Sequence, residues 1–170
     1  MKFDTNKIVA IIPAYEPPLS FVEYAKKLLQ QIPNLIVVND GSCQKYQHIF
    51  DKLKELDGCI VLGYEQNHGK GYALKTAFKY AKQNYDNSYI FVTADCDGQH
   101  LIPDLINVAK SAFLQPQALH LGSRDFSQSN VPKRSRSGNI QTRRLFRFLY
   151  GIKLSDTQTG LRAFSYDLID

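Results

Sequence analysis

The sequence predicts an α/β domain with a mostly parallel sheet between layers of helices, and two observations lead to this prediction. Short apolar runs rich in Val and Ile alternate along the chain with longer amphipathic segments, as strands and crossover helices do. The apolar runs are nearly continuous, which is typical of parallel strands that helices cover on both faces. With 170 residues, of which 44% are hydrophobic, the chain is long enough for one such domain with a substantial core.

Five apolar runs are predicted to be strands, at residues 8–13, 35–39, 59–64, 89–93 and 118–122. Segments between them repeat apolar residues at helical spacing and are predicted to be helices. These are residues 19–32, 72–83 and 101–114, the last with Pro103 in its first turn. Strands and helices in this order imply right-handed crossovers, and ligands of such sheets bind outside the carboxyl ends of the strands.

Composition limits the compartment and excludes some classes of site. No apolar run approaches the roughly 20 residues that cross a bilayer, and residues 8–12 are too short for a secretory signal core. The three cysteines are widely spaced and the four histidines show no helical pairing, which argues against a disulfide framework or a structural zinc site. We therefore expect a cytoplasmic protein, at most peripheral to the cytoplasmic face of a membrane.

The net charge of +5 is concentrated in one stretch. Residues 127–155 contain seven Lys and Arg residues and no Asp or Glu, so the rest of the chain is net negative. This local excess of positive charge indicates an anionic partner, which can be a phosphate, a lipid headgroup or a nucleic acid. Nucleic acid is the least favoured of the three, because no nucleic-acid-binding motif accompanies the charge.

Asp95 and Asp97 follow the fourth predicted strand, one residue apart. If the strand continues through them, both side chains point the same way while Cys96 faces the packed side. Two close carboxylates repel each other, and a hard cation such as Mg²⁺ or Mn²⁺ would remove the conflict, with Gln99 able to add an amide oxygen. The alternative is a solvated acidic turn that caps the next helix. The place at a strand end favours the metal.

Other strand ends carry groups suited to a phosphorylated ligand, and each also has a plainer explanation. Asp40, in Asn-Asp-Gly-Ser at 39–42, can accept hydrogen bonds from a base or ribose, or lie in a simple turn. Lys70 lies in a glycine-rich segment, 67–71, that can face an anion or be a flexible loop. That segment matches neither the P-loop nor the dinucleotide fingerprint, which argues against those enzyme classes. Arg124 can hold a phosphate or form a surface ion pair.

These motifs occur together in the order found in a known family. They are Ile-Pro-Ala-Tyr at 12–15, Val-Asn-Asp-Gly-Ser at 38–42, Asn-x-Gly-Lys-Gly-x-Ala at 67–73, Ala-Asp-Cys-Asp-Gly-Gln-His at 94–100, Gly-Ser-Arg at 122–124 and Asp-Thr-Gln-Thr-Gly-Leu-Arg-Ala-Phe at 156–164. The chain resembles the inverting family 2 glycosyltransferases over essentially its whole length. It is most similar to the dolichol-phosphate mannosyltransferase-like subgroup, which includes bacterial polyprenyl-phosphate sugar transferases.

The resemblance implies a nucleotide-diphospho-sugar transferase (GT-A, Rossmann-like) fold and a single catalytic domain over residues 1–170. It implies transfer of a sugar from a UDP- or GDP-sugar with Mg²⁺ or Mn²⁺ as the cofactor. Family members continue beyond the last motif, so it also implies a domain that is truncated at its C-terminus.

The resemblance also implies roles for individual residues. The base would lie against the first strand end, Asp40 would bind the base or ribose, Lys70 would lie near the nucleotide, and Arg124 would contact phosphate. The full set expected to bind the nucleotide sugar is Pro13, Ala14, Tyr15, Glu16, Asp40, Lys70 and Asp95. The set expected to hold the metal on the diphosphate is Asp95, Asp97 and Gln99.

Two positions depart from the family pattern. The acid that follows the alanine position in the family is shifted by one residue here, to Glu16, which weakens the assignment of Glu16 to the nucleotide-binding set. The first acid of the family's Asp-Asp-Gly-Ser is Asn39 here, which weakens any role that needs a charge at that site.

The expected reaction is an in-line displacement at the anomeric carbon, with Arg124 assisting the departure of the diphosphate. If the acceptor is a hydroxyl, as in a cell-envelope glycan, Asp156 is the candidate general base. If it is a polyprenyl or dolichyl phosphate, no base is needed, and the acid-free basic stretch favours this acceptor. Its candidate phosphate-binding residues are Arg134, Arg136, Arg143 and Arg147. A non-catalytic nucleotide-sugar-binding subunit and a nucleotidyltransferase are the alternatives.

Overall fold

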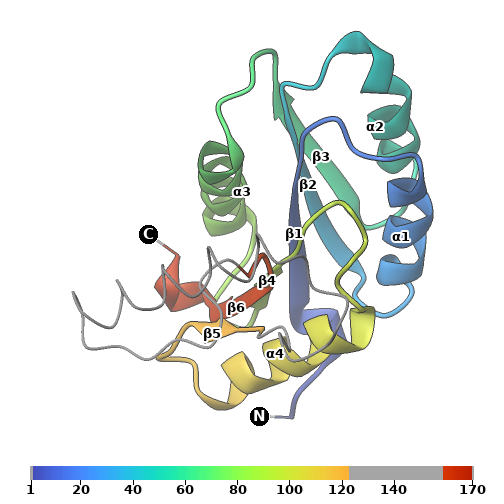
Figure 1. The fold of residues 1–170 in the computed structure, drawn as a ribbon. Coiled ribbons are helices and arrows are strands. Elements are labelled where there is room, and N and C mark those ends of the chain that lie inside the picture. Colours follow the sequence, from blue (N-terminus) through green and yellow to red (C-terminus); the bar gives the residue numbers. More distant parts are fainter. Residues whose placement is uncertain (1, 123–158, 170) are drawn as a thin grey trace, which may run out of the picture.

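The computed structural model describes residues 2–122 and 159–169. Its centre is one sheet with the strand order β3-β2-β1-β4-β6-β5 (Figure 1). Strands β1 (Ile8–Ala14), β2 (Asn34–Asp40), β3 (Cys59–Tyr64) and β4 (Ile90–Thr93) are parallel. Strand β6 (Arg162–Ser165) runs antiparallel to both β4 and β5 (His120–Leu121). The mostly parallel sheet predicted from the sequence is therefore confirmed.

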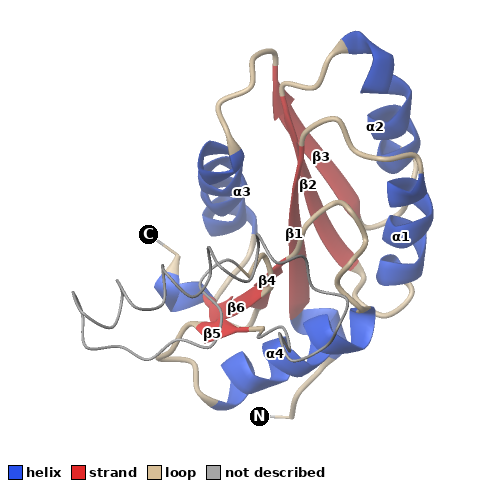
Figure 2. Ribbon diagram, in the orientation of Figure 1, coloured by secondary structure: helices blue, strands red, loops and turns tan. Residues whose placement is uncertain are grey.

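Helices lie on both faces of this sheet (Figure 2). Helices α1 (Ser20–Leu29), α2 (Gln47–Lys54) and α4 (Ile102–Leu114) pack on one face, and α3 (Lys70–Asn84) packs on the other. Short 3₁₀ turns η1 (Thr5–Lys7), η2 (Gln44–Tyr46) and η3 (Tyr166–Leu168) complete the described elements. No helix of the described ranges combines the length and the apolar character that crossing a membrane requires.

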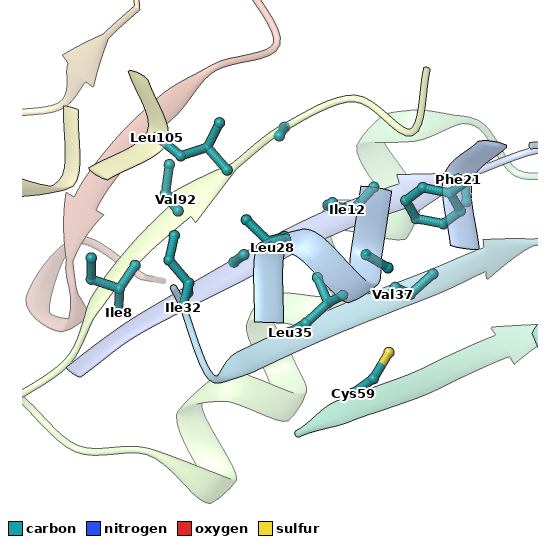
Figure 3. Close-up of a cluster of buried hydrophobic side chains, with 14 of the residues drawn as sticks. Ile8, Ile12, Phe21, Leu28, Ile32, Leu35, Val37, Cys59, Val92 and Leu105 are labelled. Atoms are coloured by element: carbon teal, nitrogen blue, oxygen red, sulfur yellow. The ribbon is translucent and has the colours of Figure 1, made fainter. Parts of the chain in front are cut away.

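Strand β1 shows why a continuous apolar run forms the centre of the sheet. All seven of its residues are buried. Ile8, Ala10 and Ile12 belong to the core under α1, α2 and α4, while Val9 and Ile11 belong to the core under α3. This alternation is the two-residue period of a strand, with both faces dry. Figure 3 shows the first of these two cores.

The structure corrects several details of the sequence prediction. Helix α2 and strand β6 were not among the predicted elements, and β5 is shorter than the run predicted at 118–122. Strand β3, at the edge of the sheet, is not covered on both faces, since Ile60 is 37% exposed. Strand β4 ends at Thr93, as predicted, so the strand geometry considered for Asp95 and Asp97 does not apply, and the pair lies in the turn that follows.

Candidate functional site

The segments that follow β1, β2, β3 and β4 line one pocket of about 350 Å³. All of these strands are parallel, so their carboxyl ends meet at the same edge of the sheet, where ligands of open α/β sheets bind. The lining residues are Pro13, Ala14, Tyr15, Asp40, Asn67, Gly69, Lys70, Asp95, Cys96 and Asp97. This edge was predicted from the sequence to be the ligand-binding edge.

Most of the predicted site residues in the described ranges meet at this pocket. Those that line it are Pro13, Ala14, Tyr15, Asp40, Lys70, Asp95 and Asp97. Two others, Glu16 and Gln99, are exposed and do not line it. The remaining predicted residues lie outside the described residues, and these are Arg124, Arg134, Arg136, Arg143, Arg147 and Asp156.

Asp95 is held by two basic side chains. Its Oδ1 accepts a hydrogen bond from the Lys70 ammonium at the start of α3, and its Oδ2 lies 3.3 Å from His100 Nε2. The hydrogen bond to His100, with the bond and the charge of Lys70, holds the pKa of the Asp95 carboxyl well below its usual range, against the opposing effect of burial. The charge of Asp95 is therefore compensated within the chain.

Asp97 differs from Asp95, because no basic side chain of the described residues pairs with it. It is exposed at the pocket, and its Oδ1 accepts a hydrogen bond from the Gln99 backbone N–H at 3.0 Å. Gln99 thus supports Asp97 through its backbone, and Gln99 itself does not line the pocket.

Asp40 is buried at the end of β2 and is 3% exposed. Its Oδ1 accepts hydrogen bonds from the Tyr64 hydroxyl at 2.6 Å and from the His68 backbone N–H at 3.0 Å. Buried carboxylates need such donors, and here they come from the end of β3 and the loop after it.

Two further contacts tie the loops around the pocket to one another. A Cβ atom at Gly41, which has φ +68°, would lie 2.3 Å from the Asn67 nitrogen, so only glycine lets these loops approach so closely. On the other side, Ser42 Oγ accepts a hydrogen bond from the Glu16 backbone N–H at 2.9 Å. Glu16, with φ +48°, therefore shapes the loop through its backbone.

The side chain of Asn39 also has a role in this loop. Its amide oxygen accepts a hydrogen bond from the Ser42 backbone N–H at 2.9 Å, which closes the turn after β2. Asn39 thus stabilises a turn, which a neutral amide does as well as a carboxylate.

A segment distant in sequence packs against Asp95. The Thr93 hydroxyl donates to the Gly160 carbonyl oxygen at 2.8 Å, and both Thr93 and Thr159 are buried. A Cβ atom at Gly160 would lie 2.2 Å from Asp95 Oδ2. The position therefore requires glycine, and it brings the chain just before β6 against the turn after β4.

The turn after β4 is also anchored to α1. The Tyr24 hydroxyl donates to the His100 carbonyl oxygen at 2.8 Å, and burial raises the pKa of Tyr24 to about 12. Cys96 packs against the core on this side, as predicted, and in addition it lines the pocket.

A second hollow, of about 490 Å³, lies between α1 and α2. It is larger, but none of the predicted site residues lines it, and its charged side chains include both signs, as in Glu23 and Lys26. Most of the predicted site residues in the described ranges line the pocket at the strand ends, so we place the candidate site there.

The family model described as glycosyl transferase family 2 matches residues 9–170. The chain belongs to glycosyl transferase family 2. It is thus an enzyme of the sugar-transferring class, and the membership of family 2 that its motifs predicted is confirmed. The nucleotide-diphospho-sugar transferase (GT-A) fold expected for such a chain is confirmed as well.

Two relatives resemble this family 2 chain along most of its length. Uncharacterized protein MJ1222 of Methanocaldococcus jannaschii is 32% identical over 98% of this chain and 68% of its own length. The UDP-N-acetylglucosamine–dolichyl-phosphate N-acetylglucosaminyltransferase of Methanococcus voltae is 30% identical over 93% of this chain and 69% of its own length. The chain thus spans about two thirds of each relative.

Solved structures match the chain at low sequence identity. The crystal structure of 4-diphosphocytidyl-2C-methyl-D-erythritol synthase matches with a TM-score of 0.54 and 8% identity, over 95% of this chain and 76% of its own. S. aureus TarS 1-349, in complex with UDP-GlcNAc, matches with a TM-score of 0.48 and 19% identity, over 76% of this chain and 38% of its own.

Three residues beside the predicted ones were missed by the sequence analysis. His100 follows Asp95 by five positions, and Gly98, with φ +73°, turns the chain back between them. The glycine in this motif is the sequence signal for that turn. Tyr64 is paired in register with Asp40, which becomes visible only once β2 and β3 are neighbours. Gly160 approaches Asp95 only through the sheet order that places β6 beside β4.

Proposed function

We propose that this chain transfers a sugar, with inversion, from a UDP- or GDP-sugar to the phosphate of a polyprenyl or dolichyl lipid. The observation that carries this proposal is the pocket in which Asp40, Lys70, Asp95 and Asp97 meet at the carboxyl ends of the parallel strands. A buried acceptor for a base, an ammonium for a diphosphate and carboxylates for a cation are the three groups that recognition of a nucleotide sugar needs.

The donor would extend across the pocket from β1 towards α3. Pro13, Ala14 and the half-exposed Tyr15 offer an apolar wall for a base, and Asp40 offers a buried acceptor beside it. Lys70 begins α3, where the positive end of the helix dipole adds to the ammonium charge. A diphosphate at this position would compete with Asp95 for Lys70.

The carboxylates fit a magnesium- or manganese-type ion that is shared with the donor. The described residues include no group of three or more His, Cys, Asp or Glu side chains placed to hold a metal by themselves. Mg²⁺ is commonly bound through one or two carboxylates together with substrate phosphates and water. Asp97 and Asp95 can provide the carboxylates. An ion bound there would neutralise the charge that develops on the leaving diphosphate.

The acceptor part of the proposal rests on charge and on one relative. The basic stretch 127–155, with Arg143 and Arg147, has the charge that a lipid phosphate at a membrane surface requires. The relative from Methanococcus voltae bears the name of a dolichyl-phosphate transferase. A phosphate acceptor is already ionised and needs no base, whereas a hydroxyl acceptor would need one, for which Asp156 remains the candidate.

Transfer of a radiolabelled sugar tests the proposal. The chain is incubated with labelled UDP- or GDP-sugars, Mn²⁺, and either polyprenyl phosphate or the matched polyprenol. We expect label in the lipid fraction only with polyprenyl phosphate, because the uncharged alcohol is a poor nucleophile without a base. Label transferred equally to polyprenol would contradict the phosphate acceptor, and donor binding without transfer to either lipid would favour a non-catalytic binding subunit.

A second experiment separates the acceptor from the donor. Charge reversal by Arg143→Glu and Arg147→Glu should lower transfer to polyprenyl phosphate by at least about tenfold, as loss of direct phosphate contacts does, while donor affinity stays unchanged. Equal loss of donor affinity would show that these arginines do not serve the acceptor specifically.

A further inference from the structure

The carboxylate of Asp40 uses one of its two oxygens within the chain. Both of its hydrogen bonds, from the Tyr64 hydroxyl at 2.6 Å and the His68 N–H at 3.0 Å, reach Oδ1. Among the described residues no donor bonds to Oδ2, although Asp40 is 3% exposed and lines the pocket. Oδ2 is therefore the oxygen that remains for a ligand.

Strand pairing and ring packing fix the position of the Tyr64 hydroxyl. Tyr64 ends β3 and pairs in register with Asp40 at the end of β2. Its ring packs edge-to-face on Tyr72 with centroids 5.1 Å apart, and it lies tilted against the His68 ring with centroids 5.3 Å apart. Desolvation, followed by the hydrogen bond to Asp40, raises the pKa of Tyr64, so it remains a protonated donor throughout the physiological range.

The backbone donor is equally fixed. The Gly41 backbone, with φ +68°, packs directly on Gln66 and Asn67, and a Cβ atom at Gly41 would lie 2.3 Å from atoms of both. This contact holds the loop that carries His68 against the loop that carries Asp40. Rotation of the carboxylate to present both oxygens to a ligand would break two hydrogen bonds in a buried place, which is costly.

A one-oxygen acceptor distinguishes between the two common bases of sugar nucleotides. Uracil presents a single ring N–H, at N3, which one carboxylate oxygen satisfies. Guanine presents N1–H and the adjacent 2-amino group side by side, and this pair matches both oxygens of a carboxylate. Against a single oxygen, one guanine donor would be left without a partner, and sites discriminate strongly against buried unpaired donors.

We propose that Tyr64 is a specificity-determining residue that restricts Asp40 to one oxygen, so that the donor nucleotide is a uridine rather than a guanosine diphosphate. The inference rests on the proposed function and narrows its donor class. Tyr64 acts here as a positioning residue, through Asp40, and makes no contact with the substrate of its own.

Calorimetric titration with UDP and with GDP, both in Mn²⁺, tests this role. The wild type should bind UDP at least about tenfold more tightly than GDP, the worth of one hydrogen bond. Tyr64→Phe should reduce the UDP-to-GDP affinity ratio by several-fold, because turning the carboxylate towards both guanine donors then breaks one hydrogen bond instead of two. Tyr85→Phe, at another partly buried tyrosine in the loop between α3 and β4, is the matched control and should keep the wild-type UDP-to-GDP affinity ratio.

Two results would overturn the inference. One is a wild type that binds GDP as tightly as UDP, and the other is a Tyr64→Phe variant that loses affinity for both nucleotides by the same factor, as a purely structural role would produce. A titration of the wild type with N3-methyl-UDP avoids any question of folding. This analogue lacks the N3–H donor and should bind at least about tenfold more weakly than UDP, whereas equal binding would refute the inference.

The inference and the proposed function can fail separately. Sugar transfer that proceeds equally from UDP- and GDP-sugars would remove the role of Tyr64 and leave the proposed reaction standing. A clear UDP preference in a chain that transfers no sugar to polyprenyl phosphate would support the role of Tyr64 and contradict the proposed reaction.

Discussion

Gly160 brings the chain closer to Asp95 than a residue with a side chain can. A Cβ atom at Gly160 would lie 2.2 Å from Asp95 Oδ2 and 2.6 Å from its Oδ1, well inside van der Waals contact. Asp95 has little freedom to move away, because Lys70 and His100 hold its two oxygens. The glycine and the three polar side chains therefore form one packed unit.

We predict that Gly160→Ala lowers the free energy of unfolding by about 1–3 kcal/mol, the usual cost of an atom inserted into a packed place. It should also weaken nucleotide binding, because Asp95 must shift. Urea denaturation measures the first effect and calorimetry the second.

The control is Gly71→Ala. Gly71 lies in α3, and a Cβ atom there would have no heavy atom within 4 Å. Alanine favours the helix, so this variant should be as stable as the wild type or slightly more stable. If Gly160→Ala were as stable as Gly71→Ala, the close approach to Asp95 would have no consequence for stability.

At the scale of the element, α3 joins the sheet core to the site. Ala73, Ala77 and Ala81 recur every four residues, are fully buried, and let the helix lie close against β1 and β2. The first residue of the same helix, Lys70, reaches Asp95. The small side chains of the buried face thus determine how near the ammonium of Lys70 comes to the pocket.

We predict that Ala77→Leu lowers the free energy of unfolding by about 1–3 kcal/mol, because three extra carbon atoms must enter a filled interface. The same substitution at the exposed Ala118 should change it by less than about 0.5 kcal/mol. Chemical denaturation of both variants measures the difference. Equal stability of the two would mean that the interface between α3 and the sheet is not tightly packed.

The elements that the sequence predicted are those with strong periodic signals. The continuous run of β1 and the repeated alanines of α3 each reflect burial of a whole face, so they could be recognised without tertiary information. Helix α2 has only Ile49, Phe50 and Leu53 to bury, and β6 has Ala163 and Phe164 between two polar residues. Elements with so few apolar residues depend on their neighbours for stability, and local pattern does not reveal them.

At the scale of the whole molecule, the sequence predicted which edge of the sheet carries the candidate site, because each strand's end could be read separately. It did not predict partners that depend on the strand order. Tyr64 reaches Asp40 because β3 neighbours β2, and Gly160 reaches Asp95 because β6 enters beside β4. Nor did the sequence predict that the chain itself supplies Lys70 and His100 as partners for Asp95.

The most direct test of this account measures donor binding with and without metal. Titration calorimetry with UDP-N-acetylglucosamine is carried out in Mn²⁺ and in EDTA on the wild type, on Asp97→Asn, and on Asp104→Asn as an exposed control on α4. We predict that Mn²⁺ raises the affinity of the wild type and of Asp104→Asn by at least about tenfold and leaves Asp97→Asn nearly unchanged. A full metal effect in Asp97→Asn, or no binding by the wild type under either condition, would contradict the account.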